Sequence, residues 1–554
     1  MKSVKLTAIC VLTSVIFLTG TTSVNAVTTE KAGAEKSATH TVRVGLYYSL
    51  PNKDTRIFSS NIESVSGFDI GYTNGSSFTK LFSLSSKELV IAPSGNLYIK
   101  NDSTKILYSG TGGSQTFGGY HLQLSGSYSA YSDALSASSK HKNAFVAYSG
   151  GVFVVRVGAY SSYDAAYEAR GLYAGSTVYS PSSDGLTVCD TVNGRIVFEY
   201  NGNSKHLAIR SHNGGTVTLP TLSNNGYNYF SYYGFFAYSV LNKKLCVVNY
   251  IELEQYVKSV MANEVGLNAS DEVTKAFSIL IRTVPLRATK HSDYGFDVCN
   301  QSCCQVYKGT FRQSERNDAF VDSTKGIILT YDGEPISCQY NYSNGGASCS
   351  SAAAWGNSPL PYLTSVFLEE PADSAVTWQE VFSEEQLYKY LKTRPAFSSL
   401  QGGIAKVEIK ETDPSGSDYV MVLAVTDQYD NTVTLNNSST VRGSLDFSSS
   451  NFVVRYLLEA NVHSSVGTEQ KKNTSVITAN GVKLFDNIGE SYKVLSANGE
   501  SGTVSADLIM FDGKGRGHGV GYSQVGAEAL VSKGYDYAYT LSFYFPGTQM
   551  TKIK

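Results

Sequence analysis

The sequence lacks a strong charge of either sign. Its 45 Lys and Arg residues are nearly balanced by 47 Asp and Glu residues, which leaves a net charge of -2. Binding to nucleic acid through phosphate contacts needs clustered cationic side chains that displace counterions, so this composition argues against a nucleic-acid partner. The apolar content of 42% indicates a globular chain, and 554 residues suffice for several hydrophobic cores.

Long apolar runs are absent after the N-terminus, so no later segment is predicted to cross a membrane. Within residues 1–26, two lysines precede an apolar run from Leu6 to Leu18, and small residues follow. This order predicts a cleaved signal peptide and therefore a secreted protein. An uncleaved N-terminal membrane anchor is the alternative. Residues 27–40 are small and polar and are predicted to form a linker.

Cysteines are few, and the odd number that follows the predicted signal peptide does not indicate a framework of disulfides. Three of them, Cys299, Cys303 and Cys304, follow closely after His291. Thiolate and imidazole groups are preferred ligands of Zn²⁺, so these four residues form a candidate metal site. The paired CxxC motifs of many structural zinc sites are missing, and a local disulfide or buried free thiols are alternatives.

Glycine and tyrosine are abundant, with 50 and 39 residues, which suits a strand-rich fold with many turns. Residues 41–48 alternate apolar and polar side chains and are predicted to open a β-rich region that extends to about residue 140. In residues 141–185, a predicted strand at 152–157 runs into a turn and a short helix. This pattern resembles part of a SPOR module, a glycan-binding fold, although an ordinary β-turn-α unit has the same pattern.

Helical spacing of apolar residues appears in two central segments, which begin near residues 251 and 270. The second helix is predicted to reach residue 287, with Pro285 bending or ending it. A further helix is predicted at 376–397, and alternating strands are predicted from 404 to 460. The fold class predicted from these patterns is α+β, with extended β regions and two central helices.

A single carboxylate, Glu264, is predicted at the end of the first central helix, just before a loop. Partial loss of solvent there would raise its pKa toward the range of a proton donor. No second carboxylate is obviously paired with it. Taken alone, a lone carboxylate in this position favours a structural residue that caps a neighbouring group.

Three further motifs carry side chains suited to binding a polymer. Gln305 begins the motif Gln-Val-Tyr-x-Gly, and Tyr342 and Asn344 precede a Gly-Gly pair. His518 lies between glycines in the motif Gly-His-Gly-Val-Gly-Tyr-Ser-Gln, which ends at Gln524. Glycines allow a close approach of backbone and ligand, but a glycine hairpin with buried aromatic residues or a simple glycine turn gives the same patterns.

Together these motifs resemble those of the SpoIID/LytB family. Glu264 is followed after eight residues by Glu-x-x-Lys-Ala and then by Arg282-Thr, and the Gly-His518-Gly motif is the most specific match. The resemblance covers residues 186–554, with a strand-rich insertion at about 376–510. It implies a peptidoglycan lytic transglycosylase domain with two central helices.

The resemblance also implies roles for individual residues. Glu264 would act as the single acid and base. The side chains expected to orient it or to bind the glycan strand are Arg282, Gln305, Tyr342, Asn344, His518 and Gln524. Some clostridial relatives carry a metal-binding cysteine pair in the loop before Gln305, which favours Cys299 and Cys304 as zinc ligands, with Cys303 and His291 completing the set.

Three departures from the family pattern leave a second interpretation open. Phe277, Val284 and Asn344 replace residues that are Gln, Tyr and Ser in the family. The loss of two hydrogen-bonding groups near the expected site is compatible with a noncatalytic peptidoglycan-binding protein or an enhancer of a partner amidase. A role in sporulation, with sporulation proteins as partners, is a further alternative that the resemblance allows.

Overall fold

The computed structural model describes residues 40–553, apart from residues 76, 102–105, 110–114, 191–194, 224–225, 266–267, 370, 465–466, 474, 479–480, 485–490, 496–500 and 506. The predicted signal peptide and all but the last residue of the predicted linker therefore lie outside the described residues. Within the described part, no helix is both long enough and apolar enough to span a bilayer. The chain is mixed helix and strand, as the α+β prediction requires.

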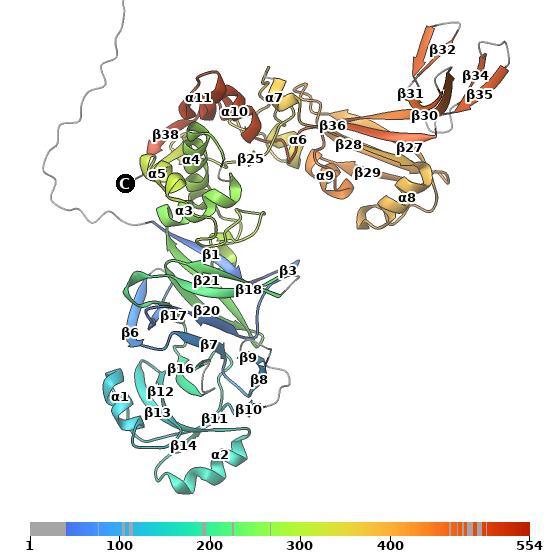
Figure 1. Ribbon diagram of the computed structural model, residues 1–554. Coiled ribbons are helices and arrows are strands. Elements are labelled where there is room, and N and C mark those ends of the chain that lie inside the picture. Colours follow the sequence, from blue (N-terminus) through green and yellow to red (C-terminus); the bar gives the residue numbers. More distant parts are fainter. Residues whose placement is uncertain are drawn as a thin grey trace, which may run out of the picture. The chain divides into compact units, whose positions relative to one another are not determined.

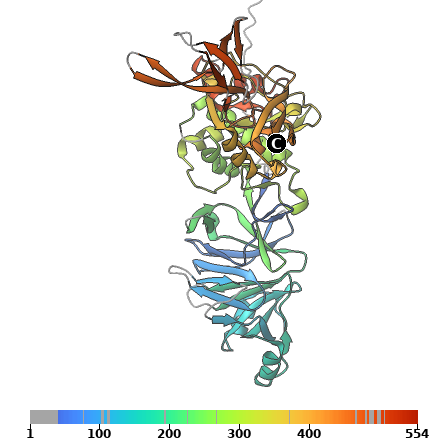
Figure 2. The same cartoon turned by 90° about the vertical axis from the view of Figure 1, so that its right-hand side faces the viewer.

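A seven-stranded sheet contains the first predicted strand, which is confirmed as β1. Its order is β22-β1-β21-β20-β17-β5-β6. The strands are β1 (Thr41–Tyr47), β5 (Phe68–Thr73), β6 (Phe78–Leu84), β17 (His206–Ser211), β20 (Phe235–Leu241), β21 (Lys244–Glu252) and β22 (Val298–Cys299). The blue β1 and the green β21 lie side by side in Figures 1 and 2 and pair antiparallel. β22 pairs with the other edge of β1 and places Cys299 opposite Gly45.

A ten-stranded sheet has the order β14-β11-β13-β12-β16-β15-β7-β4-β18-β19. The strands are β4 (Ser60–Glu63), β7 (Glu88–Pro93), β11 (Tyr120–Gln123), β12 (Ala144–Ser149), β13 (Val152–Tyr160), β14 (Thr177–Tyr179), β15 (Leu186–Asp190), β16 (Ile196–Asn201), β18 (Val217–Ser223) and β19 (Gly226–Tyr232). Buried apolar residues of both large sheets belong to one hydrophobic core. Phe82 of β6, for example, contacts Phe198 of β16 edge to face.

One part of the ten-stranded sheet is a βαββαβ unit. β11 is followed by α1 (Tyr131–Ser138), β12, β13, α2 (Tyr163–Ala169) and β14. Its four strands are adjacent in the order β14-β11-β13-β12. The strand and helix predicted around residue 152 are thus its second half, and the unit begins earlier than the predicted boundary, at Tyr120. Glycan binding by this unit stays a prediction.

The two central helices are α3 (Leu253–Glu264) and α4 (Asp271–Arg287). Ser270 begins α4, because its side chain accepts a hydrogen bond from the backbone of Val273. The apolar residues of both helices are buried in the core shared with the sheets. Pro285 does not end α4 before residue 287 but lies in its last turn, where only two helical residues follow and little of the hydrogen-bond ladder is lost.

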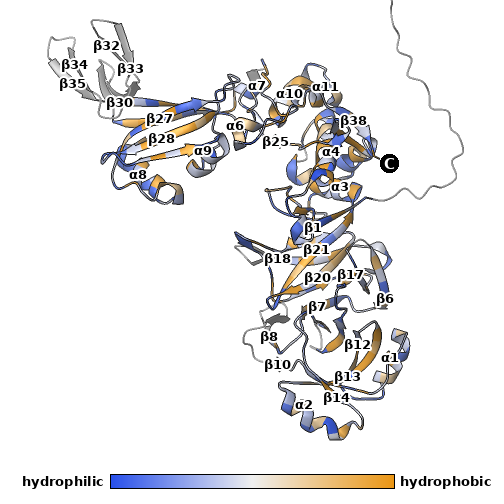
Figure 3. Ribbon diagram, turned by 180° about the vertical axis from the view of Figure 1, so that it is seen from behind, coloured by the Kyte–Doolittle hydropathy of each residue, from blue (hydrophilic) through white to orange (hydrophobic). Residues whose placement is uncertain are grey.

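The strand-rich part after residue 376 has a hydrophobic core of its own, which includes Leu391 and Phe511. The prediction of a helix over 376–397 is wrong for its first part. Residues 377–383 form β26, because they pair with β36, and the helix begins only after Ser383, which forms a capping box with Gln386. β28 (Val420–Asp427), which has hydrophobic colour in Figure 3, contributes Val420, Leu423 and Val425 to this core.

The elements of this second core follow one another between residues 377 and 514. They are β26 (Thr377–Ser383), α8 (Glu384–Lys392), β27 (Ile404–Thr412), β28 (Val420–Asp427), β29 (Thr432–Asn436), α9 (Ser438–Leu445), β30 (Phe452–Ser464) and β36 (Leu508–Lys514). The predicted alternating strands between 404 and 460 are confirmed as β27 to β30. β36 returns the chain to the region of the central helices.

Short segments bring the predicted motifs together around the central helices. β25 (Tyr340–Asn341) pairs in parallel with β37 (Tyr522–Ser523), and β37 runs into α10 (Gln524–Ser532). α10 and α11 (Tyr537–Tyr544) pack against α4, as the dark red and green helices in Figure 1 show. The last strand, β38 (Gln549–Lys552), pairs with β23 (Ile327–Tyr331). Motifs almost two hundred residues apart in the sequence thereby share one site.

Candidate functional site

Glu264 is the last residue of α3, as predicted, and its side chain is partly exposed. One carboxylate oxygen accepts a hydrogen bond from the backbone N–H of Val306, with 2.5 Å between the nitrogen and Oε1. The hydroxyl of Tyr340 is the second hydrogen-bonding partner. Burial raises the pKa of Glu264, and the bonds from Val306 and Tyr340 act in the opposite direction. The carboxyl group can therefore carry a proton at a higher pH than an ordinary Glu.

A buried chain of hydrogen bonds orients Tyr340. The hydroxyl of Tyr256 donates to Oε1 of Gln305 over 2.8 Å, and Nε2 of Gln305 donates to the hydroxyl oxygen of Tyr340 over 3.1 Å. Because the Tyr340 oxygen accepts from Gln305, its own proton is free to point at Glu264. Gln305, predicted as a substrate-binding residue, is fully buried and acts in this structure on Tyr340.

Gln524 lies close to the end of α3. Its Nε2 donates to the backbone oxygen of Val265 over 3.0 Å, and Val265 directly follows Glu264. The contact satisfies one of the carbonyl groups that a helix leaves free at its C-terminus. Gln524 is thus brought to the site as predicted, and its observed contact fixes the backbone that carries Glu264.

His518 is held in one tautomer by the glycine-rich turn. Its Nδ1 accepts a hydrogen bond from the backbone N–H of Val520 over 3.0 Å, so the proton of the neutral ring is on Nε2. Burial and the charge of Arg442 lower the pKa of His518 to about 4, while a hydrogen bond with the backbone of Tyr340 opposes them. His518 is therefore uncharged at neutral pH and supports the strand that carries Tyr340.

Tyr342 and Asn344 have opposite environments, although the sequence predicts both to line the glycan groove. The side chain of Tyr342 is 50% exposed, so its ring is available for stacking on a sugar. Asn344 is buried, and its amide donates to the backbone oxygen of Gly521 over 2.9 Å. Asn344 therefore joins the Gly-Gly turn to the segment that contains His518, and it has no free surface for a sugar.

Arg282 is fully buried inside the bundle of central helices. Its guanidinium forms two hydrogen bonds with the carboxylate of Glu254, at 2.8 and 2.7 Å, and further bonds to backbone oxygens, including that of Ile327. This geometry gives Arg282 a structural role between α3, α4 and β23. Direct contact with a glycan, which the sequence predicts, is not available to a side chain without exposed surface.

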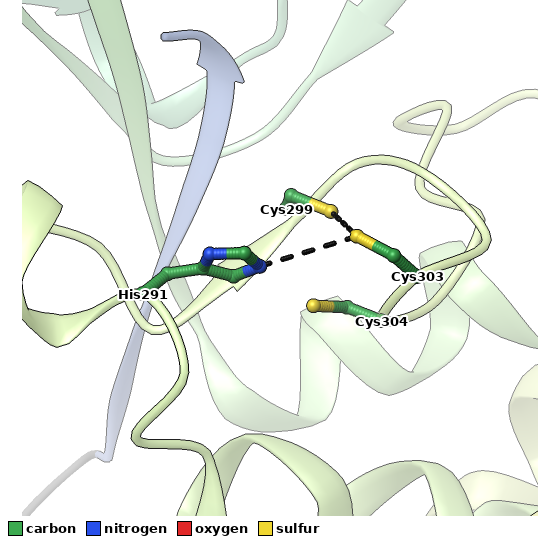
Figure 4. A group of neighbouring side chains, drawn as sticks. All are labelled: His291, Cys299, Cys303 and Cys304. Carbon is green, nitrogen blue, oxygen red and sulfur yellow. Dashed lines mark hydrogen bonds between the residues drawn. The ribbon is translucent and has the colours of Figure 1, made fainter. Parts of the chain in front are cut away.

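The cysteines predicted to bind metal gather with His291 in one cluster, shown in Figure 4. The ligand atoms of His291, Cys299, Cys303 and Cys304 all lie within 4.8 Å of one another. The sulfurs of Cys299 and Cys303 are 2.9 Å apart, and Nε2 of His291 is 4.0 Å from the sulfur of Cys303. Three thiols and one imidazole make the soft donor set of a four-coordinate zinc site of the Cys₃His type.

The thiols of the cluster have unequal proton affinities. Hydrogen bonds from Cys304, Cys303, the backbone near Gln301 and Tyr48 lower the pKa of Cys299 to about 4, against the effect of burial. The pKa values of Cys303 and Cys304 are raised, the former mainly by burial and the latter mainly by its bond to Cys299. A thiolate at Cys299 is a ready first ligand for a cation.

The loop that carries this cluster leads directly to the carboxylate. Cys304 precedes Gln305 and Val306, which contact Tyr340 and Glu264 respectively. On its other side, the loop is anchored to β1 through β22. The cluster is therefore placed to fix the position of the backbone N–H that bonds Glu264.

Sequence reasoning missed two partners of Glu264, namely Tyr340 and the backbone of Val306. Tyr340 lies in the same motif as Tyr342, and only the tertiary structure distinguishes the partly buried tyrosine beside Glu264 from the exposed one. The Phe277 that replaces a family Gln packs edge to face on Tyr340, with ring centres 5.2 Å apart. This substitution therefore puts an apolar support behind Tyr340 in place of a hydrogen-bonding group.

Comparison with known proteins is consistent with this geometry. Residues 241–331, which contain α3 and α4, match the SpoIID family, described as Stage II sporulation protein. The matched segment includes Glu264, Arg282 and the Cys/His cluster. The resemblance inferred from the sequence motifs is thereby confirmed.

Three relatives share longer stretches. The chain is 30% identical over 311 residues to the amidase enhancer of Bacillus subtilis, covering 53% of this chain and 40% of that protein. It is 26% identical to the Stage II sporulation protein D of the same species, over 55% of this chain and 76% of the relative. An uncharacterized protein of Brachyspira hyodysenteriae is also 26% identical, over 58% and 73% of the two chains. The chain thus spans less than half of the amidase enhancer.

Proposed function

Because the chain belongs to the SpoIID/LytB family through residues 241–331, we propose that it acts on the bacterial cell wall and cleaves the glycan strands of peptidoglycan as a lytic transglycosylase. The observation that carries the proposal is the environment of Glu264. Its carboxyl group is partly exposed at a helix end, its pKa is raised by burial, and two donors hold it in one position. A single carboxylate with these properties suits a reaction that needs an acid and then a base.

The proposed reaction uses Glu264 twice. Protonated Glu264 donates to the glycosidic oxygen while the bond from that oxygen to C1 of the muramic acid breaks and positive charge develops at C1. The 6-hydroxyl of the same sugar then attacks C1, and its proton passes to the carboxylate of Glu264. A 1,6-anhydro ring forms, no water is consumed, and Glu264 regains its proton for the next cycle.

The neighbouring residues support these two steps. The N–H of Val306 and the hydroxyl of Tyr340 stabilise the carboxylate that exists after the first proton transfer. Gln524 holds the backbone next to Glu264, and the exposed ring of Tyr342 offers a stacking surface for a sugar. His518 is uncharged at neutral pH, so we assign it a positioning role rather than proton transfer.

The experiment is incubation of the purified protein with peptidoglycan, both intact and stripped of stem peptides, followed by mass spectrometry. We expect products with 1,6-anhydromuramic acid ends from the wild type and none above background from Glu264→Gln. Glu385→Gln, which changes a highly exposed carboxylate elsewhere, is the matched control and should cleave like the wild type. Absence of anhydro products, or equal amounts from the Glu264 variant, would contradict the proposal.

A second candidate is the enhancement of a partner amidase without cleavage of the glycan. It is favoured by the 30% identity to a protein named amidase enhancer and by Phe277, which removes a family hydrogen-bonding group beside Tyr340. The same preparation, added to a cell-wall amidase, should then increase release of stem peptides even when Glu264 is replaced by Gln. Loss of that stimulation in the Glu264→Gln variant would argue for the enzyme instead.

We also propose that His291, Cys299, Cys303 and Cys304 hold a structural Zn²⁺. Four protein ligands saturate a tetrahedral zinc ion and leave no position for water, so the metal would stabilise the loop rather than take part in cleavage. When bound, it would neutralise the Cys299 thiolate and fix the residues that lead to Val306. The Nε2 of His291 is the ring nitrogen that faces the Cys303 sulfur, so it would be the ligand atom.

Metal analysis of the purified protein tests this site. We expect close to one zinc per chain, a lower Tm after chelation, and loss of the metal in Cys299→Ser. Cys338→Ser is the control, because Cys338 is buried outside the cluster and should leave the metal content unchanged. A metal-free wild type with a mass that indicates a disulfide between two of the cysteines would contradict the zinc site.

Export is part of the same proposal, because the glycan strands lie outside the cell membrane. The N-terminal sequence supports a cleaved signal peptide, with an uncleaved anchor as the alternative. The N-terminal sequence of the protein isolated from the cell wall fraction distinguishes the two. A start just after Ala26 would indicate cleavage, and Met1 in a membrane fraction would indicate an anchor.

A further inference from the structure

A cationic side chain that the proposed reaction does not use, that of Arg516, lies beside the exposed ring of Tyr342. The guanidinium carbon of Arg516 lies 5.9 Å from the centre of the Tyr342 ring, and both side chains are exposed. No carboxylate lies within ion-pair distance of Arg516 among the residues that the structure describes. The charge of Arg516 is therefore available to a ligand that contacts the tyrosine ring.

Backbone contacts hold this pair in place. Arg516 and Ser343 exchange two backbone hydrogen bonds, at 3.2 and 2.9 Å, so Arg516 lies directly opposite the residue that follows Tyr342. The N–H of Val525 donates to the backbone oxygen of Tyr342 over 3.0 Å.

The same contacts connect the pair to Glu264. Gln524, the neighbour of Val525, donates to the backbone oxygen next to Glu264. Two short hydrogen-bonded links therefore connect the backbone of Tyr342 with the backbone next to Glu264.

The combination of an exposed aromatic ring and cations recurs on the other segment that contacts Glu264. The chain that supplies the N–H of Val306 continues to Phe311, which is 41% exposed. The cationic groups of Lys308 and Arg312 lie 5.8 and 5.3 Å from its ring centre. Both segments that bond Glu264 therefore present a ring for stacking together with positive charge.

A ring beside a guanidinium matches a sugar that carries an acidic substituent. The ring can stack on the sugar face, and the guanidinium can form paired hydrogen bonds with a carboxylate. A neutral amino-sugar strand would use the ring but leave the cation without a partner.

We propose that Tyr342 and Arg516 form a subsite that recognises a carboxylate-bearing amino sugar, with Arg516 as its specificity-determining residue. This inference rests on the proposed function, because it extends the strand that Glu264 would cleave. Within the strand that Glu264 would cleave, the group that Arg516 would contact is the lactyl carboxylate of muramic acid, which a neutral strand of the same length lacks.

Binding measurements in the Glu264→Gln background test the subsite without cleavage. The probes are peptide-free glycan strands, which keep the lactyl carboxylates, and chitin oligosaccharides of equal length, which have none. We expect Arg516→Gln to weaken binding of the glycan strand about fivefold and to leave chitin binding unchanged, since one exposed charged contact is lost. Arg195→Gln, which removes an exposed arginine of the N-terminal part, is the charge-matched control and should change neither affinity.

Three outcomes would overturn the subsite. These are unchanged binding of the glycan strand by the Arg516 variant, equal weakening of both probes, and equal weakening by the Arg195 control. The proposed function has a separate test. Absence of anhydro products from the wild type would contradict cleavage but would leave the two measured affinities unchanged. Selective loss of the carboxylate-bearing probe would thus support the subsite even for a noncatalytic glycan-binding protein.

Discussion

At the scale of single residues, two opposing effects act on the pKa of Glu264. Burial at the end of α3 favours the neutral acid, whereas the donors from Val306 and Tyr340 favour the carboxylate. Burial is the larger effect, so the pKa rises, but the donors keep the ionised form accessible. This balance is what a group needs when it must give up a proton and take one back in the same cycle.

The raised pKa of Glu264 has a consequence for stability. In the native state Glu264 holds its proton at pH values where the unfolded chain has lost it, so its contribution to stability is complete at low pH and is lost as pH rises through the native pKa. Glu264→Gln cannot ionise and keeps an oxygen for the N–H of Val306. We therefore expect the Tm of this variant, relative to wild type, to increase from pH 4 to pH 8.

Thermal unfolding over that pH range checks the expectation. Glu385→Gln is the control, because Glu385 is largely exposed and forms an ion pair with Lys389, so its replacement should not stabilise the protein at high pH. A Tm difference for Glu264→Gln that is the same at all pH values would show that burial does not raise this pKa.

Tyr340→Phe is expected to affect both stability and the pH profile. The variant loses a donor to Glu264 and leaves Nε2 of Gln305 without an acceptor, which should cost about 1–3 kcal/mol. Without that donor the pKa of Glu264 rises further, so the fall of cleavage activity at alkaline pH should move to higher pH. Tyr342→Phe, at an exposed position, should change neither the stability nor this limb of the profile.

At this scale the sequence motifs located Glu264 but did not distinguish its partners. Tyr340 and Tyr342 are two residues apart in one motif, and no pattern in the sequence tells which ring is buried. Arg282 and Asn344 were predicted to bind substrate because they belong to matching motifs. In the structure both side chains are buried and bond neighbouring segments, which gives both residues a structural role.

At the scale of elements, a buried ion pair joins the central helices. Arg282 of α4 bonds Glu254 of α3, and Glu254 also accepts a hydrogen bond from the backbone of Gly326, just before β23. Breaking such a pair leaves an uncompensated buried charge, which is far more costly than removing both partners. The pair therefore helps to fix the position of α3 and of Glu264 at its end.

Arg282→Met is expected to destabilise the protein by about 3–5 kcal/mol, because it leaves Glu254 charged and buried. The double variant with Glu254→Gln should recover part of this loss, since the unpaired charge is then gone. Lys389→Ala, which removes an exposed pair on α8, should cost less than about 1 kcal/mol. Unfolding in urea measures all three. A loss for Arg282→Met as small as that for Lys389→Ala would exclude the structural role.

The existence of α3 and α4 could be predicted because their apolar residues recur at helical spacing and Ser270 caps the second helix. The helix predicted at 376–397 shows the limit of such patterns. Its residues 377–383 form β26 because β36, more than 120 residues later in the chain, offers a strand to pair with. Local spacing carries no information about such a distant partner.

At the scale of the whole molecule, the described residues contain two large hydrophobic cores beside two small apolar clusters. One contains the two large sheets, the central helices and the C-terminal helices, and the other is confined to the insertion between residues 377 and 514. Leu280 and Leu391 are fully buried in the first and the second core respectively. Separate cores are expected to unfold as separate cooperative units.

Calorimetry should therefore resolve two transitions. Leu391→Ala and Leu280→Ala should each cost about 2–5 kcal/mol, and each should lower the midpoint of only one transition. The Glu264 site depends on the first core, so cleavage should persist at temperatures between the two midpoints if the insertion unfolds first. A single transition that both substitutions lower equally would show that the two cores unfold together.

The sequence by itself determined the α+β class, the two central helices, the resemblance to the SpoIID family and the position of Glu264 at a helix end. These follow from local patterns, because helical spacing, caps and glycine motifs act over a few residues. Only the tertiary structure decided which motif residues face the carboxylate and which are buried supports. That choice depends on contacts between segments far apart in the chain, as when the backbone pairing of Ser343 with Arg516 places a cation over Tyr342.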